Sequence, residues 1–261
     1  MPDAPPDAPR LDVARDGTAV VARIHNPARA NALDSGILDA LARLAQAPPD
    51  DARLMVLTGA GDRHFSSGLD LGEDGGAVLE ERLRAGESLL GRVAGALAEC
   101  PIPVVAAVNG AAFGGALELA MACDWRIAAE DATLAMPAAR LGVIYAPEGM
   151  RRFLQQLGPA RTRQLFLTGR PVDARRALEI GLVDEVVPAG TLDDAVRRAA
   201  EDLGRSSPLA VAGTRAAIAA LSESPGEDGA AVVEQWRVRA YASDQFREGI
   251  AAFHERRRPR W

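Results

Sequence analysis

An apolar strand signal, a glycine-rich turn and an apolar helix signal follow one another near the middle of this chain, and this order limits the folds that it can adopt. Residues 103–108 form a β-branched apolar run that predicts a buried strand. Asn109-Gly110 is a turn signal, and Gly114-Gly115 precedes the apolar residues 116–122, which favour a helix. The stretch 101–149 is therefore predicted to contain a strand, a tight turn and a helix in immediate succession.

Glu118 lies three residues after Gly115, in the first turn of this predicted helix. Paired glycines at a helix start let a ligand approach bare backbone N–H groups, whose dipoles favour a developing oxyanion. The neighbours of Glu118 are apolar, and burial raises the pKa of a carboxyl group toward the range in which it can take and return protons. This pattern indicates a proton-transfer site; the alternative is close packing at the glycines, with Glu118 stabilising the helix start.

The composition excludes several classes of enzyme. All 30 residues counted as Lys or Arg are arginines, because the chain contains no lysine. P-loop phosphate binding through the usual lysine, Schiff-base aldolases, pyridoxal-phosphate enzymes and lysine-tethered carriers are therefore excluded. Any phosphate group of a ligand must be bound by arginine or by backbone, and the forked guanidinium suits that role. The formal net charge of -6 gives no electrostatic reason to expect a nucleic-acid partner.

The length of 261 residues, 48% of them hydrophobic, is enough to bury one sizeable core. The sequence has no run of about 18 apolar residues that would predict a membrane span, and residues 1–10 resemble neither a signal peptide nor a transit peptide. We therefore expect a disordered segment at 1–10, no membrane association and a cytoplasmic location. Cys100 and Cys123 have no spacing partner and are predicted to be reduced core residues.

Strand and helix signals alternate along the rest of the chain. A hairpin around Asp16-Gly17 is predicted from residues 11–15 and 18–25, and a helix at 37–44 is capped by Asp34 or Ser35. A long loop at 58–76 is rich in Gly, Ser and Asp, and loops of this length are often functional. Further strands are predicted at 53–58, 133–136 and 182–187, and further helices at 78–97, 150–157, 192–203 and in three stretches from Ser207-Pro208 onward.

Five separate motifs occur in a fixed order. They are NPARANAL (26–33), TGAGDRHFSSGLDL (58–71), NGAAFGGALELAMACDWRIAAEDATLAMPAARLG (109–142), LTGRPVDARRALEIGLVDEVV (167–187) and SDQFREGIAAFHERRRPRW (243–261). Together they resemble the crotonase (enoyl-CoA hydratase/isomerase) superfamily. The resemblance implies an α/β fold, with a crotonase-type spiral of ββα units at 11–195 and a helical oligomerisation region at 196–261 that builds homotrimers or homohexamers. It also implies acyl-CoA substrates, an oxyanion hole for the thioester enolate, and no cofactor, since coenzyme A is part of the substrate.

The resemblance also implies roles for individual residues. Backbone N–H groups of Ser67 and Gly115 would form the oxyanion hole, and Glu118 would be the chief acid/base, with Glu148 and Tyr145 as candidates for a second catalytic group. The residues expected to bind CoA are Arg29, Ala30, Leu33, Ser67, Gly68, Leu69, Asp70, Leu71, Gly114 and Gly115. Arginines 256–258 are further candidates for holding a CoA phosphate, and for Arg29 and for these three the alternative is a solvated position.

One position departs from the hydratase pattern. Hydratases place a second glutamate directly after the proline that corresponds to Pro137, where this chain has Ala138. Glu148 resembles the glutamate before glycine in one branch of Δ3,Δ2-enoyl-CoA isomerases, in which a 1,3-proton shift needs only one base. Tyr145 resembles the tyrosine of methylmalonyl-CoA decarboxylases, although those enzymes carry a histidine where this chain has Leu69. The alternatives are that Tyr145 is a pocket wall and that Glu148 only stabilises a helix start.

The expected function is therefore proton transfer of the hydratase or isomerase type on enoyl-CoA. A methylmalonyl-CoA-type decarboxylase is the alternative reaction, and a non-catalytic RNA-binding or scaffold relative is the alternative of another class. The latter would be favoured by a lysine-rich patch on an early helix, which a chain without lysine does not have. His25, His64 and His254 are scattered and not clustered with cysteine, so no metal site is expected, and no triad spacing accompanies His64.

Overall fold

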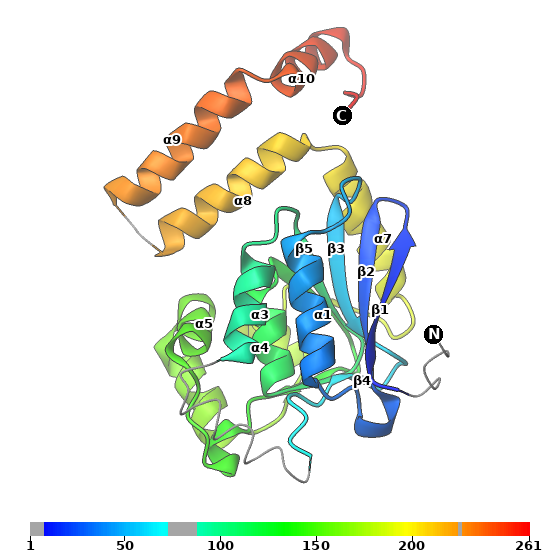
Figure 1. The fold of residues 1–261 in the computed structure, drawn as a ribbon, viewed down its shortest axis with the longest axis vertical. Coiled ribbons are helices and arrows are strands. Elements are labelled where there is room, and N and C mark those ends of the chain that lie inside the picture. The colour runs from blue at the N-terminus through cyan, green and yellow to red at the C-terminus, as the bar shows by residue number, and fades with distance from the viewer. Residues whose placement is uncertain (1–7, 73–87, 224–225) are drawn as a thin grey trace.

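A six-stranded sheet forms the centre of the protein in the computed structural model, which describes residues 8–72, 88–223 and 226–261 (Figure 1). Its strands, in their order across the sheet, are β1 (Arg10–Asp16), β2 (Ala19–His25), β3 (Leu54–Gly59), β5 (Val104–Val108), β7 (Trp125–Ala129) and β10 (Glu185–Val187). β1 and β2 are antiparallel, and the other neighbours are parallel. The predicted strands at 53–58, 103–108 and 182–187 are confirmed within one to three residues, whereas β7 was not predicted.

The hairpin predicted around Asp16-Gly17 is confirmed. Asp16 pairs with Ala19, and Gly17 adopts a φ of 57°, a conformation that glycine reaches without steric cost. Arg10 belongs to β1, so the segment predicted to be disordered ends earlier than residue 10; residues 1–7 lie outside the described part of the chain.

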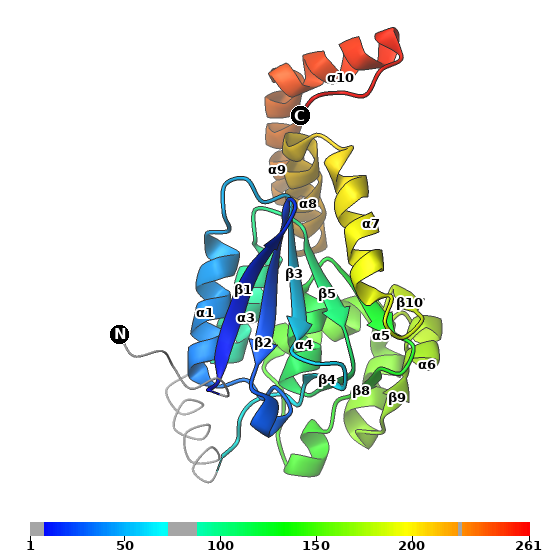
Figure 2. The same ribbon diagram turned by 90° about the vertical axis from the view of Figure 1, so that its right-hand side faces the viewer.

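Helices cover both faces of the sheet (Figure 2). On one face lie α1 (Ser35–Gln46), α3 (Leu89–Ala98) and α4 (Gly115–Ala122), and on the other lies α7 (Leu192–Gly204). Successive side chains of a strand point to opposite faces, so Met55 and Leu57 join the first core whereas Leu54 and Val56 join the second. Asp34 is the N-cap of α1, as predicted. The helix expected at 78–97 is described from Leu89 onward as α3, and 78–87 lie outside the described residues.

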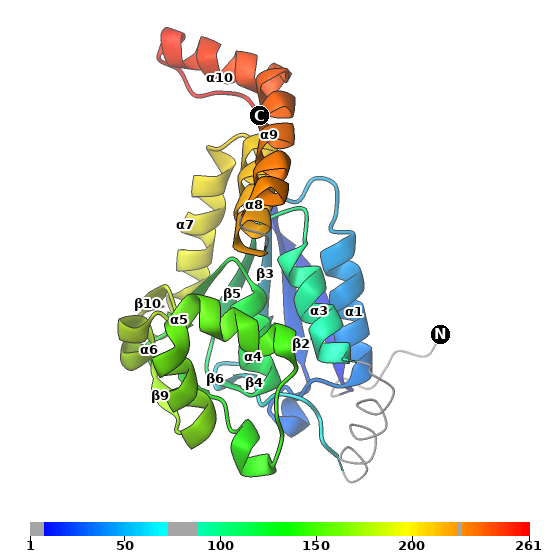
Figure 3. The same cartoon turned by 90° about the vertical axis from the view of Figure 1, so that its left-hand side faces the viewer.

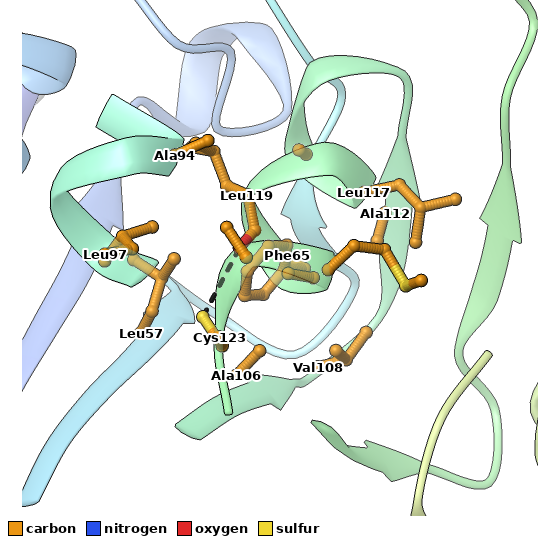
Figure 4. Close-up of a cluster of buried hydrophobic side chains, with 14 of the residues drawn as sticks. Leu57, Phe65, Ala94, Leu97, Ala106, Val108, Ala112, Leu117, Leu119 and Cys123 are labelled. Carbon is orange, nitrogen blue, oxygen red and sulfur yellow. Dashed lines mark hydrogen bonds between the residues drawn. The ribbon is translucent and has the colours of Figure 1, made fainter. Parts of the chain in front are cut away.

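Helix α4 is buried along its whole length, which explains why it lacks a polar face. Figure 4 shows Leu117 and Leu119 of this helix among Phe65, Ala106 and Val108, which come from the strands beneath it. The free cysteines are both buried, which confirms that they are core residues.

A second, four-stranded sheet connects the main sheet to the helices that follow. Its strands, in order, are β4 (His64–Ser66), β6 (Ala111–Phe113), β8 (Thr133–Ala135) and β9 (Val172–Asp173). β6 was not predicted, because Asn109-Gly110 suggested only a turn. Instead, the Asn109 side chain accepts a hydrogen bond from Gly59 N at 3.0 Å and donates one to Gly59 O at 3.1 Å. It thereby clamps the ends of two strands while the chain continues into β6.

The remaining core elements are η1 (Pro27–Arg29), η2 (Ala138–Leu141), α5 (Pro147–Thr168) and α6 (Ala174–Ile180). Helix α5 runs beside α4 (Figure 3). It breaks at Gly158, whose φ of 72° precedes Pro159, and this break coincides with the end of the helix predicted at 150–157.

Three C-terminal helices extend away from the sheet (Figures 1 and 3). They are α8 (Pro208–Glu223), α9 (Glu227–Tyr241) and α10 (Asp244–Glu255). α7 packs on the sheet through Leu192, Ala195 and Val196, so the division proposed at residue 195 falls within a core helix. In the described ranges, none of the helices is both long and apolar enough to cross a membrane. The α/β fold class with a helical C-terminal region is confirmed.

Candidate active site

Two loops that are far apart in sequence are joined by backbone hydrogen bonds at one end of the sheet. Ser67 N donates to Ala30 O at 3.0 Å, Leu33 N donates to Gly68 O at 2.8 Å, and Asp70 N donates to Leu33 O at 2.9 Å. These bonds bring the first sequence motif (26–33) and the second (58–71) together. Most of the residues expected to bind CoA therefore lie in one place.

Arg29 projects from the first loop toward the second. Its Nη1 lies 2.5 Å from Oδ1 of Asp70, and its carbonyl oxygen accepts a hydrogen bond from the Ser67 hydroxyl at 3.0 Å. The Arg29 side chain is 53% exposed, so part of its guanidinium still faces solvent. Since Asp70 neutralises some of its charge, contact between Arg29 and a CoA phosphate remains a prediction.

Two consecutive non-glycine residues of the first loop adopt left-handed backbone conformations. The φ angles are 51° at Ala30 and 58° at Asn31. The buried Asn31 side chain donates to Ala60 O at 2.9 Å and to His64 O at 2.8 Å, which holds the loop in place. Conformations of this kind concentrate at functional sites, where the surroundings stabilise them.

The glycine pair forms the start of α4, as the sequence predicted. Gly114 has a φ of 54° and donates its N–H to Ala135 O at 2.9 Å, and Gly115 is the first helical residue. The first N–H groups of a helix have no partner within the helix. Among the described residues, none accepts a hydrogen bond from Gly115 N. This amide is therefore available to a ligand.

The second proposed oxyanion donor, Ser67, is engaged within the protein. Its N–H donates to Ala30 O, and Gly68 N donates to the Ser66 hydroxyl at 3.1 Å. This finding corrects the prediction for Ser67, because an N–H that already has an acceptor cannot bind a thioester oxygen at no cost.

Leu69 offers the N–H that Ser67 does not. Leu69 and Leu33 form a parallel β-bridge, whose two hydrogen bonds are made by Gly68 O and Asp70 N on either side of Leu69. The N–H of Leu69 itself therefore points away from Leu33, and no described residue accepts a hydrogen bond from it. A Cβ placed on Gly68 would lie 3.4 Å from Gly115 N, and one placed on Gly115 would lie 3.3 Å from Leu69 Cγ. The Leu69 and Gly115 backbones are thus neighbours.

Glu118 is buried beside these amides. It is 3% exposed, in the first turn of α4 between the fully buried Leu117 and Leu119. Burial raises the pKa of Glu118 to about 7, while the charge of Arg152 lowers it and that of Glu148 raises it further. A carboxyl group with this pKa can take and return a proton near neutral pH.

The start of α5 covers the Glu118 carboxylate. A Cβ placed on Gly149 would come 2.5 Å from Glu118 Oε1, so only glycine leaves room for the carboxylate there. Arg152, one turn later, places Nη1 3.8 Å from the same oxygen. Neither residue was predicted from the sequence. The signal for Arg152 was its position four residues after Glu148, which puts both side chains on one side of a helix.

A family model for enoyl-CoA hydratase/isomerase matches residues 15–261. The chain belongs to the enoyl-CoA hydratase/isomerase family. A carnitinyl-CoA dehydratase of Salmonella paratyphi A is 35% identical over 259 residues, which are 96% of this chain and 97% of that protein. The crystal structure of an enoyl-CoA hydratase from Bacillus anthracis superposes with a TM-score of 0.90 at 31% identity, covering 96% of this chain and 98% of the other.

A structure described as an enoyl-CoA hydratase/carnithine racemase, from Magnetospirillum magneticum, is similar as well. It has a TM-score of 0.88 and 28% identity, with coverage of 96% and 94%. The crotonase resemblance inferred from the motifs is therefore confirmed. This enoyl-CoA hydratase/isomerase family member is an acyl-CoA enzyme of the lyase or isomerase type.

The Tyr145 side chain of this family member lies beside the start of α4. A Cβ placed on Gly114 would lie 3.6 Å from the Tyr145 hydroxyl, and the Tyr145 ring packs edge-on against Phe166 with centroids 5.5 Å apart. Burial raises the pKa of Tyr145, and the charge of Glu118 adds to the effect, so the phenol stays protonated.

Glu148 is exposed in the first turn of α5, and Ala138 is buried where a hydratase would carry its second glutamate.

The C-terminal arginines 256–258 lie in the tail that follows α10. Arg257 forms ion pairs with Glu248 at 2.6 Å and with Glu255 at 2.5 Å, and the indole of Trp261 donates to Arg205 O at 2.9 Å. The charge of Arg257 is therefore already compensated by these glutamates. Among the described residues there is no group of three or more His, Cys, Asp or Glu side chains that could hold a metal ion.

Proposed function

We propose that this enzyme moves a proton within an enoyl-CoA through one carboxylate, Glu118, while the N–H groups of Leu69 and Gly115 bind the thioester oxygen. The observation that carries the proposal is the position of Glu118. It is a buried carboxyl group with a pKa of about 7, in the first turn of a helix whose leading amide has no partner in the described part of the chain. Two such donors in a dry site stabilise a developing oxyanion by several kcal/mol.

The proposed reaction is a 1,3-proton shift. Ionised Glu118 removes a proton from the α-carbon of a 3-enoyl thioester, and the electron pair moves onto the carbonyl oxygen between the two amides. The dienolate then takes the same proton back from Glu118 at its γ-carbon, which gives the 2-enoyl thioester. The atoms balance without water or a second base, so one carboxylate is sufficient.

The surroundings of Glu118 support isomerisation over hydration. Addition of water by the two-carboxylate mechanism needs a second acid where this chain has the methyl group of Ala138. Glu148 is a second carboxylate whose charge acts on Glu118. It is therefore the candidate for a second catalytic group, although the one-carboxylate proton shift does not require it.

Decarboxylation is a second candidate reaction, which the placement of Tyr145 supports. Its neutral phenol lies beside Gly114, next to the proposed oxyanion hole. Loss of CO2 from a malonyl-type thioester leaves an enolate that must be protonated at carbon, and the partly buried phenol of Tyr145 could supply that proton.

Product analysis in deuterated water distinguishes these reactions. The protein is incubated with 3-enoyl-CoA, trans-2-enoyl-CoA and methylmalonyl-CoA, and with Glu118→Gln and Glu148→Gln variants. We expect conversion of 3-enoyl-CoA to 2-enoyl-CoA and a loss of about 10²- to 10⁴-fold in Glu118→Gln. Formation of propionyl-CoA from methylmalonyl-CoA would favour the decarboxylase, and unchanged turnover in Glu118→Gln would disprove the mechanism.

Assembly into a homotrimer or homohexamer is part of the proposal. Large apolar side chains on α8, α9 and α10 are exposed in the single chain. They are Ile218, Leu221, Val238, Tyr241, Phe246, Ile250 and Phe253. Exposed large apolar side chains gathered on three successive helices are typical of an interface between subunits. In analytical ultracentrifugation Phe253→Glu should weaken assembly, whereas Val13→Glu, on the exposed side of β1, should not; a monomeric wild type would contradict the proposal.

The remaining parts of the proposal concern compartment and ligands. A cytoplasmic location accords with the two free cysteines, which remain reduced thiols in such a compartment. We propose that the acyl-CoA substrate is the only small molecule required, without a separate cofactor or nucleic-acid partner. Full activity of protein dialysed against a chelator and freed of nucleic acid would support this.

A further inference from the structure

Arg152 lies inside the proposed active site with an unused hydrogen-bond donor. Its side chain is 19% exposed, and Nη1 is a buried atom with no hydrogen-bond partner among the described residues. The nearest carboxylate oxygen, Oε1 of Glu118, is 3.8 Å away, which is beyond hydrogen-bond distance. A buried donor without an acceptor is costly to the fold, so it calls for a functional explanation.

The other buried arginines are paired more closely. Arg126 places Nη2 2.6 Å from Asp184, although its Nε has no partner, and Arg215 places Nε 2.7 Å from Asp124. Their charges are therefore neutralised by hydrogen-bonded carboxylates. Arg152 differs because Glu118 can only partly neutralise it at 3.8 Å, and because burial raises the pKa of Glu118 and so disfavours its charged form.

A second, negatively charged hydrogen-bond acceptor would pair with the free donor of Arg152 and balance its charge. Guanidinium binds carboxylates through short charge-assisted hydrogen bonds of about 2.7–2.9 Å. We propose that Arg152 binds a carboxylate carried by the acyl group of the substrate, so that the enzyme acts on CoA thioesters of short dicarboxylic acids. This inference rests on the function proposed above, because it places the acyl group beside Glu118.

The charges around the site restrict the ligand further. Glu118 on α4 and Glu148 on α5 would repel an added carboxylate, whereas Arg152 would attract it. Binding of such a ligand therefore depends on the positive charge of Arg152. Arg152 Nη1 lies 3.8 Å from Oε1 of Glu118. A ligand carboxylate bound to Arg152 must therefore lie near the substrate carbons at which Glu118 acts. A long chain between thioester and carboxylate would not fit this requirement.

Binding of unreactive thioesters tests the inference separately from catalysis. Glutaryl-CoA and pentanoyl-CoA have the same acyl length and differ in the terminal carboxylate. Their dissociation constants are measured by calorimetry for the wild type and for Arg152→Gln, Arg152→Lys and Arg151→Gln. Arg151 is an exposed arginine one position earlier on α5 and controls for long-range charge.

We expect the wild type to bind glutaryl-CoA about 10- to 100-fold more tightly than pentanoyl-CoA. Arg152→Gln should abolish this preference, Arg152→Lys should retain part of it, and Arg151→Gln should leave it intact. If Arg152→Gln does not fold, as judged by circular dichroism, loss of most of the preference in folded Arg152→Lys supports the inference and full retention overturns it.

Two results would overturn the inference: equal binding of both thioesters by the wild type, or an unchanged preference in Arg152→Gln, whether or not both ligands bind more weakly to that variant. The second would show that Arg152 binds a water molecule or only positions Glu118. Neither of these results depends on turnover. Failure of the proposed function would instead appear as unchanged isomerisation in Glu118→Gln.

Discussion

The carboxylate of Glu118 lies directly against the backbone of Gly149. A Cβ on Gly149 would come 2.5 Å from Oε1, 2.8 Å from Cδ and 3.1 Å from Oε2 of Glu118. Separations below about 3.0 Å are not tolerated between such atoms, so the absence of a side chain at this position fixes where the acid can sit. The first turn of α5 is thereby part of the site, although it follows Glu118 by some thirty residues.

We predict that Gly149→Ala reduces kcat by about 10- to 100-fold, because displacing a catalytic group by about 1 Å has an effect of this size. Steady-state kinetics with 3-enoyl-CoA measure the change. Gly95→Ala is the matched control, since a Cβ at this position of α3 meets nothing within 4 Å. Equal activity of Gly149→Ala and Gly95→Ala would show that the carboxylate is not confined by α5.

The burial of Glu118 should reduce stability at high pH. Its pKa in the folded protein, about 7, lies above its ordinary value of 4.5, so the folded state favours the protonated form. The stability associated with this proton is fully present below pH 4.5 and is lost as pH rises through about 7. Glu118→Gln should therefore be more stable than the wild type at pH 8, by about 1–3 kcal/mol. Urea denaturation at pH 5 and pH 8 measures this difference, and an equal difference at both pH values would contradict it.

Catalysis should show the opposite dependence on pH. If ionised Glu118 is the base that starts the reaction, kcat/KM for 3-enoyl-CoA rises with pH through an apparent pKa of about 7. Because the charge of Arg152 lowers the pKa of Glu118, Arg152→Gln should move this midpoint upward. A midpoint near 4.5, or one that does not move in Arg152→Gln, would be inconsistent with this account of Glu118.

Replacing single backbone amides by esters tests the assignment of the oxyanion hole. An ester at Leu69 removes its N–H but keeps the side chain, and we expect kcat to fall by about 10²- to 10³-fold. The same change at Ser67 removes a hydrogen bond to Ala30 O and should mainly lower stability. A larger loss of kcat at Ser67 than at Leu69, in semisynthetic proteins with intact circular dichroism, would restore Ser67 as the donor.

Arg215 should be the main polar anchor between α8 and the core. It donates to the Asp124 carboxylate at 2.7 Å and to the carbonyl oxygens of Leu97 and Cys100. Arg215→Ala removes the ion pair with Asp124 and the hydrogen bonds to these two carbonyl oxygens, so we expect a loss of about 2–5 kcal/mol in the free energy of unfolding. Arg237→Ala, which breaks an exposed pair with Glu234, should cost less than about 1 kcal/mol. Similar effects of both changes in thermal denaturation would contradict this role.

The central feature of the site could be predicted from the sequence because it is local. Gly115 and Glu118 are three residues apart, and a helix of fixed pitch places them in the same turn whatever surrounds it. The same reasoning gave the hairpin, the Asp34 cap and most strands. It missed β4, β6, β7 and β9, since β4, β6 and β9 are only two or three residues long and β7 has no Gly or Pro turn signal at either end.

The identity of the second amide donor was decided by the tertiary structure. Ser67 N is not free because it donates a hydrogen bond to Ala30 O, whereas Leu69 N has no such acceptor. The loop around Ala30 is distant from both residues in sequence. Arg152 reaches Glu118 for a similar reason, because only the packing of α5 against α4 sets their separation. Local spacing is encoded in the chain, whereas the pairing of hydrogen-bond donors and charges between distant segments exists only once the segments pack.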